Sequence, residues 1–168
     1  QDNGGTANGG IDISPPQEFT ITVSAINDPP EWTVPGSQTA GQETDLVIPG
    51  ISLADLDAGN NELVINLTAL SGTLTLNDTA NLTFGPGDGL ADRTMSFTGT
   101  LAAVNAALAN LIYRGDPGFT GLDIINLAAN DQGFTGAGGP ESATAAIYVN
   151  VAAAANLSIR KQVEPTPL

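Results

Sequence analysis

The chain has 168 residues, and its eighteen acidic and four basic side chains give a formal net charge of −14. This charge disfavours nucleic acid and anionic membranes as partners, because both are negative themselves. The sequence contains no histidine and no cysteine, which excludes Ser-His-Asp and Cys-His catalytic groups and the usual zinc ligands. Hydrophobic residues make up 41% of the chain and charged residues 13%, so we expect a folded domain.

The N-terminal part carries one predicted strand and a linker. Residues 1–17 are rich in Gly, Asn and Pro, and from Phe19 to Ala25 apolar residues alternate with Thr and Ser. A period of two over this length predicts a half-buried strand. Asn27-Asp28-Pro29-Pro30 ends it, because prolines remove backbone donors and fix an extended path. We interpret residues 27–30 as a short, stiff linker.

From Glu31 onward the pattern is a series of short apolar runs separated by turn residues. Many short strands at this spacing predict an all-β fold, an antiparallel Greek-key β-sandwich. The predicted strands cover residues 32–34, 44–48, 62–70, 72–76, 82–84, 93–98, 111–114, 122–129 and 142–151.

One segment departs from the period of two. Leu101, Val104 and Leu108 fall at helical spacing among alanines, and Thr100 is suited to cap the first turn. We expect one short helix that crosses between the sheets and packs against the core.

A similar sequence pattern occurs in the N-terminal part and in the C-terminal part of the chain. Asp2-Asn3-Gly4-Gly5, a Gly/Pro loop and the predicted strand 19–23 resemble Asp131-Gln132-Gly133, a Gly/Pro loop and the strand 145–149. Residues 1–26 therefore read as the last strand or strands of a preceding repeat, or as a donor strand that pairs with another subunit. The predicted division is completed by the linker 27–30, a sandwich domain 31–152, and a linker with the first strand of a following domain at 153–168.

Three loops are rich in oxygen ligands. They are residues 25–30 (AINDPP), 53–62 (LADLDAGNNE) and 128–133 (AANDQG). Calcium takes six to eight oxygens from carboxylates, amides and carbonyls and tolerates irregular geometry. We therefore predict calcium as the cofactor.

These motifs, in this order, resemble the cadherin-like tandem repeats of large bacterial surface adhesins over residues 31–151. The stretches that carry the resemblance are residues 42–44 (QET), 51–59 (ISLADLDAG), 72–76 (GTLTL), 82–89 (LTFGPGDG), 95–112 (MSFTGTLAAVNAALANLI) and 131–133 (DQG). The resemblance implies a sandwich domain that serves as one unit of an extracellular array.

The same resemblance implies that the three oxygen-rich loops converge at one end of the sandwich, and it implies a set of calcium ligands. Asn27 and Asp28 are similar to the linker motif of cadherins, Asp55 and Asp57 to their Asp-X-Asp, and Asp131 to the aspartate before a glycine near the last hairpin. Glu43 is similar to the acidic residue that serves the opposite junction. The exit at residues 152–156 has no Asn-Asp-X-Pro counterpart, which puts a calcium site at that end in doubt. Residues 156–167 (NLSIRKQVEPTP) resemble instead the first strand of immunoglobulin-like repeats in bacterial surface proteins.

The predicted function is that of a structural repeat in an extracellular bacterial surface protein or fibre, stiffened by calcium at the inter-domain junction and serving adhesion or surface assembly. Its expected partners are neighbouring domains, or further subunits joined by strand addition into a homo-oligomer or fibre. The alternative is a carbohydrate- or protein-binding adhesin module. Paired acids could also indicate a glycosidase, but the acids lie in Gly-rich loops and the chain has one Trp, two Tyr and five Phe. We therefore expect no enzyme activity.

Overall fold

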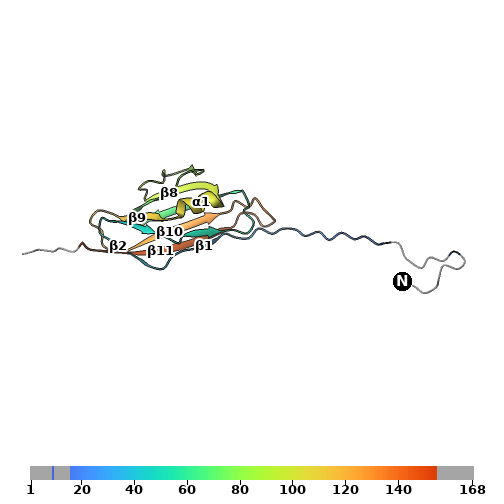
Figure 1. Cartoon of the computed structure of the whole chain (residues 1–168), viewed down its shortest axis with the longest axis horizontal. Coiled ribbons are helices and arrows are strands. Elements are labelled where there is room, and N and C mark those ends of the chain that lie inside the picture. The colour runs from blue at the N-terminus through green and yellow to red at the C-terminus, as the bar shows by residue number, and fades with distance from the viewer. Residues whose placement is uncertain (1–8, 10–15, 155–168) are drawn as a thin grey trace, which may run out of the picture.

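The computed structural model describes residue 9 and residues 16–154. These residues form strands and one helix in the following order (Figure 1): β1 (Glu31–Thr33), β2 (Gln38–Gly41), β3 (Asp45–Ile48), β4 (Ser52–Ala54), β5 (Glu62–Ala69), β6 (Gly72–Thr75), β7 (Thr83–Phe84), β8 (Thr94–Thr100), α1 (Leu101–Leu108), β9 (Leu111–Gly115), β10 (Gly121–Asn130) and β11 (Ser142–Ala152).

The strands form a six-stranded sheet, a three-stranded sheet and a two-stranded sheet. Their orders are β2-β11-β10-β5-β8-β7, β3-β9-β6 and β1-β4. Neighbouring strands are antiparallel except for β2 and β11, which pair in parallel with Gln38 opposite Val149. The predicted all-β sandwich with one short helix is confirmed. Strands β2 and β4, and the parallel pair, were not predicted.

The inward faces of the two larger sheets share one core. Alternate residues of β5, such as Leu63, Ile65 and Leu67, are buried, and they belong to the same cluster as Leu111 and Tyr113 of β9. This is the expected result of period-two patterning, because successive side chains of a strand point to opposite faces. The outward residues of β5 are Glu62, Val64, Asn66 and Thr68, three of which are polar.

Helix α1 holds strand β4 in position through the side chain of Asn105. Thr100 caps it as predicted, with its Oγ1 accepting from the backbone N–H of Ala103 at 3.4 Å. The side chain of Asn105 then binds the backbone of Leu53 twice: its Oδ1 accepts from the Leu53 N–H at 2.8 Å and its Nδ2 donates to the Leu53 carbonyl at 2.9 Å. The amide takes the place of a neighbouring strand and holds β4 just before Asp55.

The strand predicted at residues 19–25 pairs with no described residue of this chain. Residues 16–25 belong to no sheet and extend away from the sandwich (Figure 1), and Phe19, Ile21 and Val23 are 83%, 74% and 88% exposed. The alternation is present, but the sheet that would bury its apolar face is not among the described residues. The segment reaches the sandwich only at Ile26, which forms a parallel bridge with Ala137.

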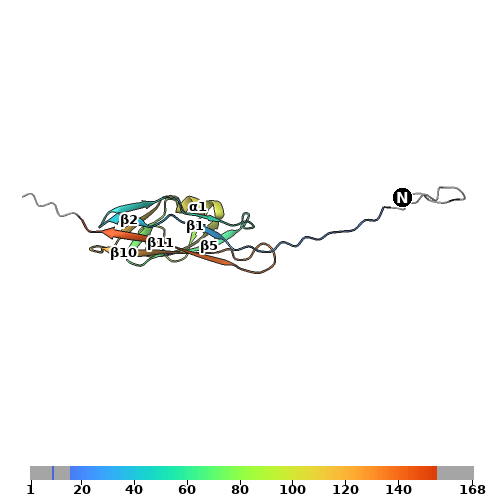
Figure 2. The same cartoon turned by 90° about the horizontal axis from the view of Figure 1, so that it is seen from below.

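The chain enters and leaves the sandwich at opposite ends. Figure 2 shows the N-terminal segment joining near β1 and α1, whereas β11 runs out at the far end beside β2. We call these ends the N-terminal pole and the C-terminal pole. The predictions for residues 1–8, 10–15 and 155–168, including the immunoglobulin-like strand, lie outside the described residues.

Candidate metal centre at the N-terminal pole

Strand pairing brings the linker beside the Asp-X-Asp loop. Strands β1 and β4 are antiparallel with Glu31 opposite Ala54, so the residues before β1 lie next to those after β4. The indole N–H of Trp32 donates to the carbonyl of Ala143 at 3.3 Å and ties β1 to the start of β11. Asn27 of the linker also donates to Asp131 at 2.6 Å, so the three oxygen-rich loops meet at one pole, as predicted.

The first half of the site anchors the linker to the loop at residues 131–139. The Asn27 N–H donates to the Ala137 carbonyl, and the Ala137 N–H donates to the Ala25 carbonyl, both at 2.9 Å. The Asn27 side chain is buried, and its Nδ2 donates to Asp131 Oδ2 at 2.6 Å and to the Gly139 carbonyl at 3.0 Å. The linker is thus held by two backbone and two side-chain hydrogen bonds.

Asp131 organises the loop that receives the linker. Its Oδ1 accepts from the N–H groups of Gly133 at 2.9 Å and Glu141 at 2.8 Å, while its Oδ2 accepts from Asn27. Both oxygens of this buried carboxylate therefore have protein donors, which is the usual condition of a buried acid. In this structure Asp131 is an anchor for the linker.

The backbone of the linker passes directly over Gly136. This glycine has a φ of +77°, and a Cβ placed on it would lie 2.6 Å from both the Asn27 nitrogen and the Ile26 carbonyl carbon. Any larger residue would have to displace the linker. Glycine is required here for the contact as well as for the backbone conformation.

The second half of the site is the pair of aspartates after β4. Asp55 Oδ1 accepts from the N–H groups of Asp57 at 3.1 Å and Ala58 at 2.8 Å, an ordinary Asx turn. Asp57 Oδ2 accepts from the N–H of Asp28 at 2.9 Å, which connects the linker to this loop. The hydroxyl of Thr135 donates to the Asp57 carbonyl at 2.7 Å and joins the two halves of the site.

Two oxygens of this pair have no partner. Asp55 Oδ2 and Asp57 Oδ1 are buried and receive no hydrogen bond from any described residue. Burial raises the pKa of Asp55 above its ordinary value; two backbone N–H groups oppose this, and the neighbouring Asp57 carboxylate adds to it. Buried polar atoms are rarely left unsatisfied, so the pair is suited to a cation that neutralises both carboxylates at once.

The described residues bring a pair of carboxylates to this place, too few charged ligands for a metal held by charged side chains alone. Within residues 16–154, no three His, Cys, Asp or Glu side chains gather closely enough to hold a metal. A cation on Asp55 and Asp57 would therefore complete its shell with amide or carbonyl oxygens and water, as calcium accepts. Both N–H groups of the Asn27 amide are engaged by Asp131 and Gly139, so only its Oδ1 is free to act as a ligand.

Glu43 lies away from these residues, at the C-terminal pole. Its Oε1 accepts from the N–H of Gly118 at 3.3 Å, and the adjacent Gln42 accepts from the N–H of Ala154 at 3.4 Å. This agrees with its predicted place near the opposite junction. Sequence reasoning missed Thr135 and Asn61, whose side chain donates to the Thr135 hydroxyl at 3.2 Å. Both are common turn residues, and no spacing marks them as members of the site.

Comparison with protein-family models and with curated proteins found no match. Among solved structures, the chain is similar to a cohesin module from Clostridium perfringens ATCC13124 family 33 glycoside hydrolase, with 12% sequence identity and a TM-score of 0.37. The alignment covers 76% of this chain and 100% of that module. A likeness at this level identifies neither a family nor a function. The fold defines the chain as an all-β sandwich module, and none of its described segments forms a helix that could cross a lipid bilayer.

Proposed function

We propose that this chain is a structural repeat of an extracellular bacterial surface protein or fibre, in which calcium stiffens the junction with the preceding domain. The observation that carries the proposal is the pair of buried, unpartnered oxygens, Asp55 Oδ2 and Asp57 Oδ1. They lie in the loop that also holds the backbone of the linker through Asp28.

The bound cation acts on the linker through Asp57. Calcium between the two carboxylates removes their mutual repulsion and fixes the Asp57 side chain, whose other oxygen accepts the Asp28 N–H. Without the cation, repulsion between Asp55 and Asp57 favours loop conformations in which this contact is broken. An affinity on the order of 10⁻⁴ to 10⁻³ M is sufficient for extracellular modules.

A repeated loop motif supports the tandem arrangement. The loop that receives the linker has the pattern Asp-X-Gly-X-Thr-X-X-Gly-Gly at residues 131–139, and the same pattern occurs at residues 2–10. Three of the repeated positions are Asp131, Thr135 and Gly139, which contact Asn27 or Asp57 in this structure. The repeated Asp, Thr and Gly positions support a preceding domain with a similar loop. Residue 7 of the first copy is Ala where the second copy has Gly136, so the close contact with Gly136 is not part of the repeated pattern.

The exposed segment before the linker supports the same arrangement. After the first copy of the motif comes the alternating segment 19–25, just as β11 follows the second copy. Strand β11 is an interior strand of its sheet, between β2 and β10. A corresponding place in the preceding domain would bury Phe19, Ile21 and Val23, which are exposed here. Location at the bacterial surface and a role in adhesion follow from the sequence resemblance alone.

The test is amide hydrogen exchange of the linker with and without calcium. Calcium titration of the chain should show saturable binding, and the Asp28 N–H should exchange more slowly in calcium than in EDTA. The double variant Asp55→Asn/Asp57→Asn should lose both effects while keeping its thermal transition. Saturable calcium binding with no change in linker exchange would contradict the stiffening role, and no binding at millimolar calcium would contradict the site.

A matched glycine pair tests whether linker docking matters apart from the cation. Gly136 and Gly118 both have a φ of +77°, but only Gly136 faces the linker, since nothing lies within 4 Å of a Cβ on Gly118. Alanine at either position carries the same backbone strain, about 1–2 kcal/mol. We expect Gly136→Ala to abolish protection of the Asn27 N–H and Gly118→Ala to preserve it. Equal protection in both variants would show that the linker does not pack on the loop.

A further inference from the structure

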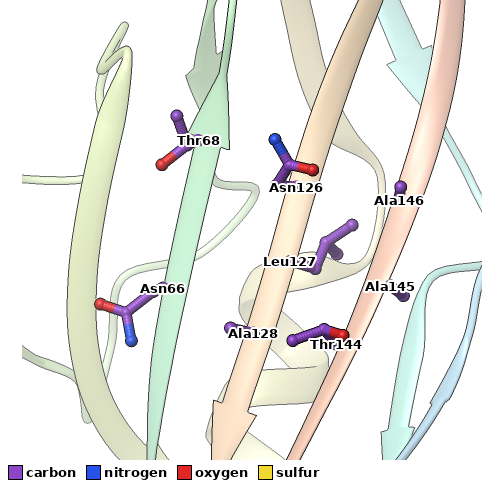
Figure 3. A pocket seen from close by; sticks show the side chains of 8 residues that line it. All are labelled: Asn66, Thr68, Asn126, Leu127, Ala128, Thr144, Ala145 and Ala146. Carbon is purple, nitrogen blue, oxygen red and sulfur yellow. The ribbon is translucent and has the colours of Figure 1, made fainter.

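A shallow hollow lies on the outer face of the six-stranded sheet, away from the metal centre. It has a volume of about 580 Å³, within the range of roughly 300–1,000 Å³ typical of ligand sites. We call it the outer hollow (Figure 3). Its lining residues are Asn66, Thr68, Asn126, Leu127, Ala128, Thr144, Ala145 and Ala146.

The register of three strands explains the shape of the outer hollow. Across β5, β10 and β11 one row reads Thr68, Asn126 and Ala146, and the next reads Asn66, Ala128 and Thr144. Side chains in such rows are neighbours on one face of a sheet. Because Ala128 and Ala146 are short, the longer side chains around them form a rim, and the two methyl groups form an apolar floor.

The rim offers free amide and hydroxyl groups. Asn66, Asn126 and Thr144 are exposed, and no hydrogen bond joins the side chains of these three to any other described residue, whereas the Thr68 hydroxyl pairs with Thr94 at 3.3 Å. An asparagine amide both donates and accepts hydrogen bonds. Adjacent hydroxyl groups of a sugar ring require both, and the C–H face of the ring fits an apolar floor.

The electrostatics of this face favour a neutral ligand. On a chain of net charge −14, the outward positions of β5, β8, β10 and β11 carry a single charged residue, Glu62 at the start of β5. Tyr148 is 46% exposed and lies two positions beyond Ala146 on the same face of β11. Its ring supplies an amphipathic surface at the edge of the outer hollow.

We propose that the outer hollow binds a neutral carbohydrate chain lying across β5, β10 and β11. The ligand would set its ring faces on Ala128 and Ala146 and exchange hydrogen bonds with Asn66 and Asn126. A second copy of this chain is the poorer occupant, because face-to-face association would bring two net charges of −14 together. The site is independent of the calcium junction.

The experiment is an NMR titration in EDTA with five neutral hexasaccharides built from glucose in β1,4 linkage, glucose in α1,4 linkage, xylose, mannose and N-acetylglucosamine. At least one should shift the amide resonances of residues 126–128 and 144–146 saturably. The double variant Asn66→Ala/Asn126→Ala should bind that sugar about tenfold more weakly, since each lost hydrogen bond contributes modestly. Filling the floor with Ala128→Gln should also weaken it, while the control Asn77→Ala, at an exposed position outside the outer hollow, should not.

Three outcomes would overturn the proposal. The first is that none of the five sugars shifts these resonances. The second is binding that the asparagine and Ala128→Gln variants leave unchanged, which would place the sugar elsewhere. The third is a concentration-dependent dimer that Ala146→Glu dissociates in the absence of any sugar binding, which would identify a second copy as the occupant.

Discussion

Two regions of this molecule contain buried carboxylate oxygens, and they differ in whether these oxygens receive hydrogen bonds. Asp123 is 1% exposed, and its Oδ1 accepts from the N–H groups of Ser71 at 2.9 Å and Ile124 at 2.7 Å, while its Oδ2 accepts from the Tyr113 hydroxyl at 2.8 Å. At the N-terminal pole, Asp55 and Asp57 each retain a buried oxygen that receives no hydrogen bond from the described residues.

The difference separates a structural acid from a candidate ligand. The protein satisfies Asp123 completely, so removing this group breaks the fold locally whatever ions are present. It leaves one buried oxygen of Asp55 and one of Asp57 without a hydrogen-bond donor. The free-energy cost of burying these oxygens therefore depends on whether the solution supplies a cation. Each of the following experiments compares the two regions by asking whether a change in stability depends on calcium.

The largest effect is expected for Asp123→Ala. The substitution leaves two backbone N–H groups and the Tyr113 hydroxyl without their acceptor in a buried place, at a cost of about 3–6 kcal/mol. Urea denaturation should show the same loss in calcium and in EDTA. If calcium reversed the loss of stability, the two regions would not differ in their dependence on calcium.

Removal of calcium from the unmodified chain comes next. With a dissociation constant on the order of 10⁻⁴ M and 10 mM calcium, binding to the folded state stabilises it by about 2.7 kcal/mol. EDTA should therefore lower the thermal midpoint, and the same concentration of magnesium should restore little of it. A midpoint unaffected by EDTA would contradict the role given to Asp55 and Asp57.

Tyr113→Phe should cost about 1–3 kcal/mol by leaving Asp123 Oδ2 without its donor. Burial raises the pKa of Tyr113, and its hydrogen bond to Asp123 raises it further. Because the folded-state pKa exceeds the ordinary value of about 10, this stabilisation is complete below that pH and declines as the pH rises above it. Denaturation measured from pH 8 to 11 should show the decline in the parent chain and not in the variant.

The smallest effect, and the one of opposite sign, is expected for Asp55→Asn in EDTA. Burial and Asp57 raise the pKa of Asp55, so the ionised carboxylate destabilises the calcium-free fold. The parent chain in EDTA should therefore gain stability from this group as the pH falls through the folded-state pKa towards its ordinary value. At neutral pH the variant should be more stable than the parent by less than about 1 kcal/mol, because solvent screens the pair. If the variant were less stable than the parent in EDTA, the ionised Asp55 carboxylate would not be destabilising the calcium-free fold.

Much of this architecture could be predicted from local patterns. The helix was marked by the change from a period of two to helical spacing after Thr100, and the long strands by their alternation. Strands β2 (QTAG) and β4 (SLA) contain a single β-branched residue between them, so their composition does not mark them as strands. They exist because of partners distant in sequence: β4 is held by β1 and by the amide of Asn105, which no local signal indicates.

The candidate site divides in the same way. The acidic loops could be recognised because clustered Asp and Asn in turns have a known chemistry. What each carboxylate does could not be, since this depends on which donors the fold brings to it. Asp131 and Asp55 look alike in sequence, but only Asp131 has donors for both of its oxygens. Asp123 is the one charged residue of strand β10, and a lone acid among apolar residues is a local sign of a buried polar group.

The most direct test is a crystal structure of the chain grown in millimolar calcium, with anomalous scattering to locate the ion. We predict one peak at the N-terminal pole, 2.3–2.6 Å from both Asp55 Oδ2 and Asp57 Oδ1. An ordered loop without a peak between these two oxygens would contradict the account.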